Sequence, residues 1–244
     1  MTADASGPES SPDDVARLSD AQRSLRAQML ATEHWSLLAS RSTTQSEVLT
    51  RIAIFLTLVS AGLVTLGVLG NATEFRGWFG VAALGVLFLL ALLGVITTFR
   101  VINTATEDLV YVLAMNRLRG AYLDLDPGIE RYLVTSPADD LGGATQTYYP
   151  FAQRNFTQVF ASSMMVMLVV ESSLIGLLGG SLIFALAGSV AWAVVVGVAA
   201  MLAAFFTWLR LGYHSYRSVG RAHVPLRRSD EPVPDAAADD SRDA

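Results

Sequence analysis

The sequence predicts an all-α fold, a polytopic membrane protein with four transmembrane helices and additional cytoplasmic helices. Of its 244 residues, 52% are apolar and 16% are charged, whereas about a quarter of an average soluble domain is charged. Residues 52–70 and 77–99 contain no charged side chain, and residues 155–209 contain only Glu171. Because a helix crosses the hydrocarbon core of a bilayer with about 20 apolar residues, these runs are long enough for four spans.

The N-terminal segment is polar and precedes the first span. Residues 1–12 are rich in Ser, Pro, Asp and Glu, a composition typical of disorder. Apolar residues at helical spacing, interleaved with arginines, predict a cytoplasmic amphipathic helix over residues 13–50. No basic stretch followed by an apolar core and a cleavage site is visible there, so the first apolar run is expected to stay as a helix.

The apolar runs are predicted to form two hairpins. The first covers residues 52–100 and the second covers residues 157–210, with a cytoplasmic helical region over 101–156 between them. The turn of the second hairpin is predicted at Gly179-Gly180 or at Gly188-Ser189. We place its two spans near 158–180 and 189–209, with residues 181–188 as a turn or a short re-entrant segment. We expect a cytoplasmic tail over 211–244 that is disordered from about residue 225.

The arginines predict the orientation. All 17 basic residues are arginine, and 16 of them fall in the N-terminal, central and C-terminal segments; only Arg76 lies in a predicted loop on the other side. Since cytoplasmic segments carry the excess of basic residues, we expect both termini and the central region in the cytoplasm. The lack of lysine and the high content of Ala, Val, Leu and Gly indicate a bacterial plasma membrane protein.

The composition excludes several kinds of chemistry. There is no cysteine, which removes disulfides, iron–sulfur clusters and thiol nucleophiles. The absence of lysine removes the phosphate-binding P-loop and Schiff-base chemistry. No pair of histidines has metal-ligand spacing, and no nucleic-acid-binding motif is present. We therefore expect no enzyme activity, no cofactor and no nucleic-acid partner; the three histidines are His34, His214 and His223.

Two pairs of acidic residues in the central region have structural explanations. Asp124 and Asp126 resemble the paired carboxylates of metal-dependent sugar transferases, but an aspartate directly before Pro127 is better explained as a helix N-cap. Asp139 and Asp140 are interpreted as part of a solvated loop.

Glu171 is the most specific candidate for function, because it lies in the middle of the third span. An acidic side chain at this depth costs about 2.5–3.5 kcal/mol on insertion scales. No basic residue lies within a predicted span, and burial without a counter-ion favours the neutral carboxylic acid. Two interpretations stay open, an ion or proton site and a structural hydrogen bond between helices. The candidate hydroxyl partners are Ser172, Ser173, Ser60 and Thr65.

Small residues recur at four-residue spacing in the third and fourth spans. Such ladders let helices approach closely in a membrane, within one chain or between copies. Ser172, Gly176 and Gly180 form the first ladder, and Ala193 and Gly197 form the second.

Two cytoplasmic segments carry a resemblance. Residues 33–42 (EHWSLLASRS) and 115–123 (MNRLRGAYL) resemble segments of four-helix integral membrane proteins of actinobacteria. This resemblance covers about residues 15–220 and implies a membrane location and a shared architecture. The layout of the first half is also similar to SLATT-type effectors of bacterial conflict systems, which are proposed pore formers, although the second hairpin departs from that pattern.

Two functions are consistent with these patterns. The first is a structural or signalling membrane protein that acts through its cytoplasmic helices. The alternative is a small homo-oligomeric ion or proton channel or carrier that uses Glu171. The expected partners are the lipid bilayer, further copies of the chain and a cytoplasmic protein.

Overall fold

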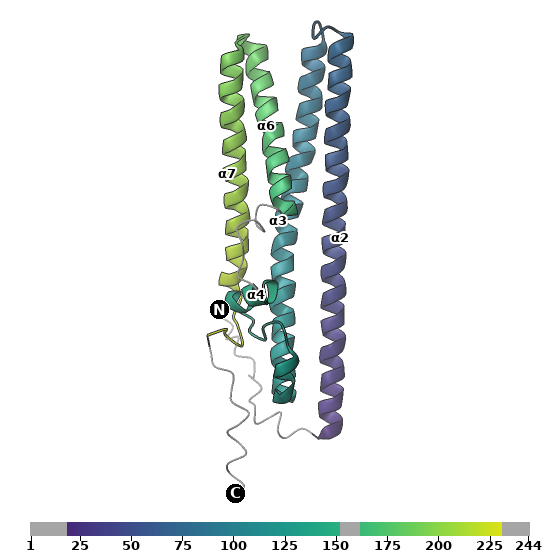
Figure 1. Cartoon of the computed structure of the whole chain (residues 1–244), viewed down its shortest axis with the longest axis vertical. Helices are drawn as coiled ribbons and strands as arrows, with labels where there is room; N and C mark the ends of the chain where they lie inside the picture. Colours follow the sequence, from purple (N-terminus) through teal and green to yellow (C-terminus); the bar gives the residue numbers. More distant parts are fainter. Residues whose placement is uncertain (1–18, 152–161, 231–244) are drawn as a thin grey trace, which may run out of the picture. The chain divides into compact units, whose positions relative to one another are not determined.

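The computed structural model describes residues 19–151 and 162–230, and every regular element in this part of the chain is helical (Figure 1). Four of these helices are long and apolar enough to cross a membrane, in agreement with the predicted fold class. The elements are α2 (Asp20–Ala72), α3 (Phe79–Leu125), the 3-10 helix η1 (Pro127–Tyr132), α4 (Leu141–Tyr148), α6 (Ser163–Ala187) and α7 (Val190–Ala222).

The described chain divides into two compact units. The membrane unit contains residues 42–108 and 162–219, which include the apolar part of each long helix. The extramembrane unit contains residues 19–41, 109–151 and 220–230. Both α2 and α3 contribute residues to each unit, because neither helix is interrupted.

The predicted N-terminal helix and the first span are one helix. α2 has 53 residues, and the polar stretch at residues 42–45 does not end it, because that stretch weakens the apolar period without containing a glycine or proline. A capping box starts the helix: Ser19 N donates to Gln22 Oε1 (2.9 Å), and Gln22 N donates to Ser19 Oγ (3.3 Å). The predicted helix start and the disorder over residues 1–12 fall outside the described residues.

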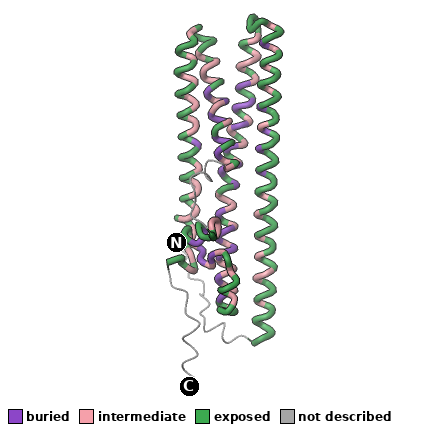
Figure 2. The backbone as a smooth tube through the Cα atoms, in the orientation of Figure 1, coloured by how far each residue is buried: buried purple, intermediate pink, exposed green. Residues whose placement is uncertain are grey.

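The core of the membrane unit is built by α2, α3 and α6. Figure 2 shows that buried positions recur along these helices, as one side of each packs inward. A smaller apolar cluster adds α7 through Trp208, which packs with Ile102 and Leu168. The main cluster comprises Val48, Ile52, Phe55, Val59, Leu87, Leu90, Ala91, Val101, Met167 and Leu174.

Each hairpin turns at a residue with positive φ. Between α2 and α3, Glu74, Phe75 and Gly77 have φ values of 49°, 56° and 64°. Between α6 and α7, Gly188 caps α6 with φ 65° and its N–H donates to the Phe184 carbonyl. The turn is therefore at Gly188-Ser189. The predicted end of the third span near residue 180 is wrong, because α6 continues to Ala187. Gly180 packs closely against α7 and does not end the helix.

The C-terminal segment is ordered further than predicted. α7 continues to Ala222, and residues 223–229 then bind the central region through hydrogen bonds. Disorder was expected from about residue 225, since this stretch is polar and contains Pro225. That expectation is wrong for residues 225–230, because acidic side chains elsewhere in the extramembrane unit satisfy its backbone groups. Residues 231–244 are outside the described part.

Candidate functional site

Glu171 is fully buried inside the membrane unit, on the side of α6 that faces α2 and α3. Gly94 of α3 makes room for it: a Cβ atom at Gly94 would overlap the Glu171 carboxylate and would lie 2.9 Å from Cζ of Phe55 in α2. The carboxylate is thus held against the backbone of α3 with an aromatic ring beside it. Glu171 faces the interior of the helical unit rather than lipid.

The carboxylate has no hydrogen-bond partner in the described part of the chain. Neither Oε1 nor Oε2 is bonded, and the buried hydroxyls of Ser172 and Thr98 are also without a partner there. Three of the four hydroxyl groups suggested by the sequence bond a carbonyl of their own helix instead. Ser173 donates to Val169 O, Ser60 donates to Leu56 O and Thr65 donates to Ala61 O, each at 2.8–2.9 Å.

Of the interpretations left open, a hydrogen bond from a hydroxyl to Glu171 is not formed within the described residues, and the reason is local. A serine or threonine in a helix readily bonds the carbonyl one turn earlier. This bond is available at every such position, whereas a bond between helices requires exact placement. A buried carboxyl without a counter-ion is favoured in its neutral form. Chemically, Glu171 is a single proton-binding group in an apolar surrounding.

The small-residue ladders join α6 to α7. A Cβ at Gly176 would lie 2.7 Å from the Gly197 carbonyl oxygen, and a Cβ at Gly180 would lie 2.9 Å from the Ala193 carbonyl oxygen. Ser172 is buried one turn before Gly176. The structure thus brings the two predicted ladders together within one chain, and side chains larger than hydrogen at Gly176 or Gly197 would separate the helices.

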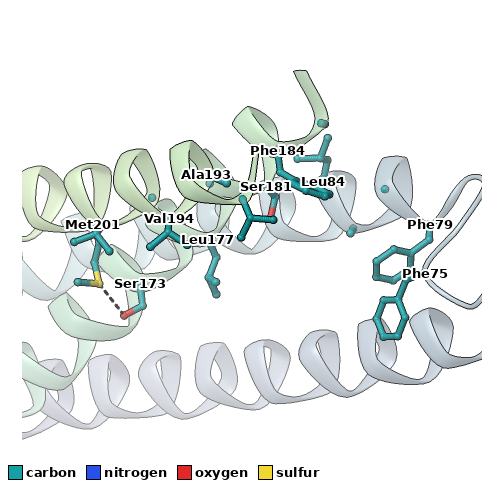
Figure 3. A pocket seen from close by; sticks show the side chains of 18 residues that line it. Phe75, Phe79, Leu84, Ser173, Leu177, Ser181, Phe184, Ala193, Val194 and Met201 are labelled. Carbon is teal, nitrogen blue, oxygen red and sulfur yellow. Dashed lines mark hydrogen bonds between the residues drawn. The ribbon is translucent and has the colours of Figure 1, made fainter. Parts of the chain in front are cut away.

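An apolar groove lies on another side of α6. Its volume is about 820 Å³, and α3, α6 and α7 line it. Figure 3 shows Phe75 and Phe79 side by side at one end, and Ser173 pointing toward Met201. The Ser173 hydroxyl lies 3.9 Å from the Met201 sulfur. Ser173 therefore belongs to this groove and not to the surroundings of Glu171, although the sequence grouped the two residues.

Charged side chains precede the apolar segment of α2 and follow that of α3. Arg100 binds Glu107 (2.9 Å) and Glu47 (3.1 Å), and Glu47 also binds Arg51 (2.8 Å). The hydrogen bonds from Arg100 and Arg51 lower the pKa of Glu47. These ion pairs join α2 to α3 where the charge-free runs end, so they mark one boundary of the apolar region.

The extramembrane unit has a second buried carboxylate, Asp139. Its Oδ1 accepts from the backbone N–H groups of Leu226 (2.9 Å) and Arg227 (2.8 Å). Its Oδ2 accepts from Arg117 Nε (2.7 Å) and lies 3.2 Å from His223 Nε2. Burial opposes ionisation, but the backbone of Arg227, the Arg117 guanidinium and the backbone of Leu226 outweigh it and lower the pKa of Asp139.

Asp140 extends this contact. Its Oδ1 caps α4 by accepting from Gly143 N (2.6 Å), and its Oδ2 accepts from the backbone N–H (3.0 Å) and the hydroxyl (2.9 Å) of Ser229. We call the contact of Asp139 and Asp140 with residues 223–229 the C-terminal latch. The interpretation of these two aspartates as a solvated loop is wrong, because the C-terminal segment covers them.

The other acidic pair behaves as a cap and a surface ion pair. Asp126 accepts from Gly128 N (2.9 Å) and caps η1, while Asp124 binds Arg227 at 2.8 Å. Within the described residues, no group of His, Cys, Asp and Glu side chains is placed to hold a metal ion.

Sequence reasoning missed the latch, although signals for it were present. Aspartate is a favoured N-cap residue, which is a weak signal for Asp140 because two glycines follow it within the first turn. No local pattern connects Asp139 to Arg227, which lies 88 residues further along the chain. Comparison of the chain with known protein families, with curated proteins and with solved structures finds no match.

Proposed function

We propose that the chain is a structural or signalling membrane protein that acts through its extramembrane helices. The observation that supports this proposal is the continuity of α2 and α3. These helices have 53 and 47 residues, and each joins an apolar span to the extramembrane unit without a break. A shift or rotation of such a helix within the membrane is carried along its axis, as in helix-shift switches.

The orientation follows from the arginine distribution. We place the extramembrane unit and both termini in the cytoplasm of a bacterial cell, where a protein partner or a second copy of the chain can reach them. The latch supports a signalling role, because it connects the segment after α7 to the region after α3 through a few polar contacts. Such contacts can open without unfolding of the long helices.

Glu171 supports a second candidate, a homo-oligomeric channel or carrier for protons or monovalent cations. The observation in its favour is the burial of both carboxylate oxygens without a bonding partner in the described residues. Intramembrane acidic residues are expensive, and they commonly mark ion or proton pathways.

One pair of variants tests the first candidate. Hydrogen exchange is measured in lipid nanodiscs for wild type, Glu171→Gln and the control Ser173→Ala, which removes a polar group from another side of α6. If a change beside α3 in the membrane unit is carried along that helix, exchange over residues 109–125 and 223–229 changes at least about fivefold in Glu171→Gln. Exchange there stays unchanged in Ser173→Ala. Unchanged exchange in a folded Glu171→Gln protein contradicts the proposal.

Ion flux separates the second candidate from the first. Proton and cation flux is measured in liposomes that contain wild type or Glu171→Gln. Flux that is present in wild type and lost in the folded variant supports conduction through Glu171. Absence of flux in both, over a range of pH and voltage, refutes the channel and leaves the first candidate unaffected.

A further inference from the structure

Arg119 differs from Arg117 and Arg227 in its contacts. Arg117 of the same helix binds Asp139, and Arg227 binds Asp124. Arg119 binds no carboxylate in the described part of the chain. Its Nη1 donates to Asn116 Oδ1 at 2.6 Å, which uses one of the five donors of a guanidinium.

The position of Arg119 is fixed by a buried amide. Asn116 is fully buried, and its Nδ2 donates to the Ala138 carbonyl at 2.8 Å. Its Oδ1 also accepts from the Thr147 hydroxyl at 2.8 Å. Because Asn116 is bonded through both its amide nitrogen and its oxygen, it is a fixed acceptor for Arg119, and this bond uses one guanidinium donor.

Two further basic side chains from α2 lie near Arg119. The His34 ring stacks on Tyr122, with centroids 6.0 Å apart, and its buried Nδ1 has no partner in the described residues. Arg41, two turns further along α2, lies over the Tyr148 ring of α4 at 5.9 Å. These contacts are all within the extramembrane unit, and they gather three basic groups from two helices beside aromatic rings.

The basic groups oppose one another electrostatically. Burial and the neighbouring Arg41 lower the pKa of Arg119, and burial and Arg119 lower the pKa of His34. The like charges of Arg119 and Arg41 repel each other and destabilise the folded state, whereas a bound anion would turn this repulsion into attraction. Arginine donors in a fixed fork suit the oxygen atoms of a phosphate group.

We propose that Arg119, Arg41 and His34 form a binding site for a phosphate group of a soluble ligand. The position of Arg119 along α3 favours a soluble source of the phosphate over a lipid headgroup. Arg119 lies about 28 Å of helical rise beyond Arg100, where the ion pairs mark the end of the apolar segment. A lipid headgroup at the membrane surface does not reach this far. The site does not depend on the function proposed above.

Binding of inorganic phosphate and of pyrophosphate tests the site. Titrations use the full chain in nanodiscs of phosphatidylcholine, with calorimetry for the affinity and hydrogen exchange for the location. We expect protection of residues 31–41 and 116–122, and at least a tenfold weaker affinity in Arg119→Gln. The matched control is Arg131→Gln, which removes an arginine that also lies over a tyrosine ring, Tyr132 at 4.9 Å, and it should bind as wild type does.

Further variants and lipids complete the test. Arg119→Lys keeps the charge and should retain part of the affinity, which separates loss of binding from loss of folding. Equal weakening in Arg119→Gln and Arg131→Gln, no binding by wild type, or sulfate binding as tight as pyrophosphate binding would each overturn the proposal. Protection that occurs only with anionic lipid in the nanodisc would assign the phosphate to a headgroup and would also overturn it.

Discussion

Among the described residues, each unit buries one carboxylate completely, and the two carboxylates differ in their hydrogen bonds. Asp139 in the extramembrane unit receives two backbone N–H groups and a guanidinium, with an imidazole 3.2 Å away. Glu171 in the membrane unit has no partner among the described residues. The difference follows from the backbone. Residues 223–229 are not helical and have free N–H groups to offer, whereas the backbone N–H groups around Glu171 are used within helices.

The two carboxylates have different structural roles in their units. Asp139 joins distant segments, and two backbone N–H groups and the Arg117 guanidinium stabilise its charge. Glu171 contributes little bonding and occupies a space that Gly94 leaves for it. A polar group that is kept without a stabilising bond is a candidate for function, because intramembrane polar groups are otherwise costly.

The largest expected effect comes from the same substitution at both carboxylates. Asp139→Leu should lower the free energy of opening of residues 223–229 by about 3 kcal/mol, because it leaves Arg117 and two backbone N–H groups without their acceptor. Glu171→Leu should leave the stability of the membrane unit unchanged or raise it by about 1 kcal/mol, since an apolar side chain replaces an unbonded polar one. Hydrogen exchange in nanodiscs measures both.

The conservative variants supply the controls for this pair. Asp139→Asn keeps the Oδ1 acceptor for the backbone groups of residues 226 and 227 and should lose less stability than Asp139→Leu. Asp124→Asn removes one exposed ion pair with Arg227 and should change stability by less than about 1 kcal/mol. A destabilisation of about 2 kcal/mol or more in Glu171→Leu, the cost of a lost buried hydrogen bond, would show that Glu171 is bonded after all.

A smaller effect is expected from filling the space that Gly94 leaves. Gly94→Ala should destabilise the membrane unit by about 2 kcal/mol, because its Cβ overlaps the Glu171 carboxylate. Gly85→Ala on the same helix meets nothing within 4 Å and should be neutral or slightly stabilising. Steric trapping or denaturant unfolding in lipid measures these differences.

A double variant identifies the cause. Glu171→Ala removes the side chain that Gly94→Ala would overlap, so the two substitutions together should be less damaging than the sum of their separate effects. Additive effects would mean that the cost of Gly94→Ala comes from Phe55 or from the backbone, and Glu171 would not depend on this glycine.

The sequence predicted those features that depend on a local pattern. Charge-free runs predicted the four long apolar helices, and the Asp126-Pro127 pair predicted the cap of η1. It failed where contacts join distant segments. Asp139 was interpreted as solvated because its partners lie near residue 226 and leave no local pattern in the sequence. The end of the third span was predicted at Gly180 because glycine is common both at close helix contacts and in turns.

The smallest predicted effect concerns His34, which resembles Glu171 in having a buried atom without a partner in the described residues. Burial and Arg119 lower its pKa in the folded state, so the unfolded chain takes up a proton first as the pH falls. Its contribution to stability is complete above about pH 6.5 and declines below it. Between pH 7.5 and 5.5, in phosphate-free buffer, the extramembrane unit should lose up to about 1 kcal/mol.

Hydrogen exchange corrected for the intrinsic rate at each pH measures this loss over residues 31–41. His34→Phe keeps a ring to stack on Tyr122 but does not titrate, so it should remove most of the dependence on pH, while His214→Phe in the membrane unit should leave it intact. If His34→Phe retains the full dependence, another group in the unit titrates instead. The unbonded Nδ1 of His34 would then have no effect on stability. The difference between Asp139 and Glu171 would in that case come from their solvent surroundings and not from their hydrogen bonds.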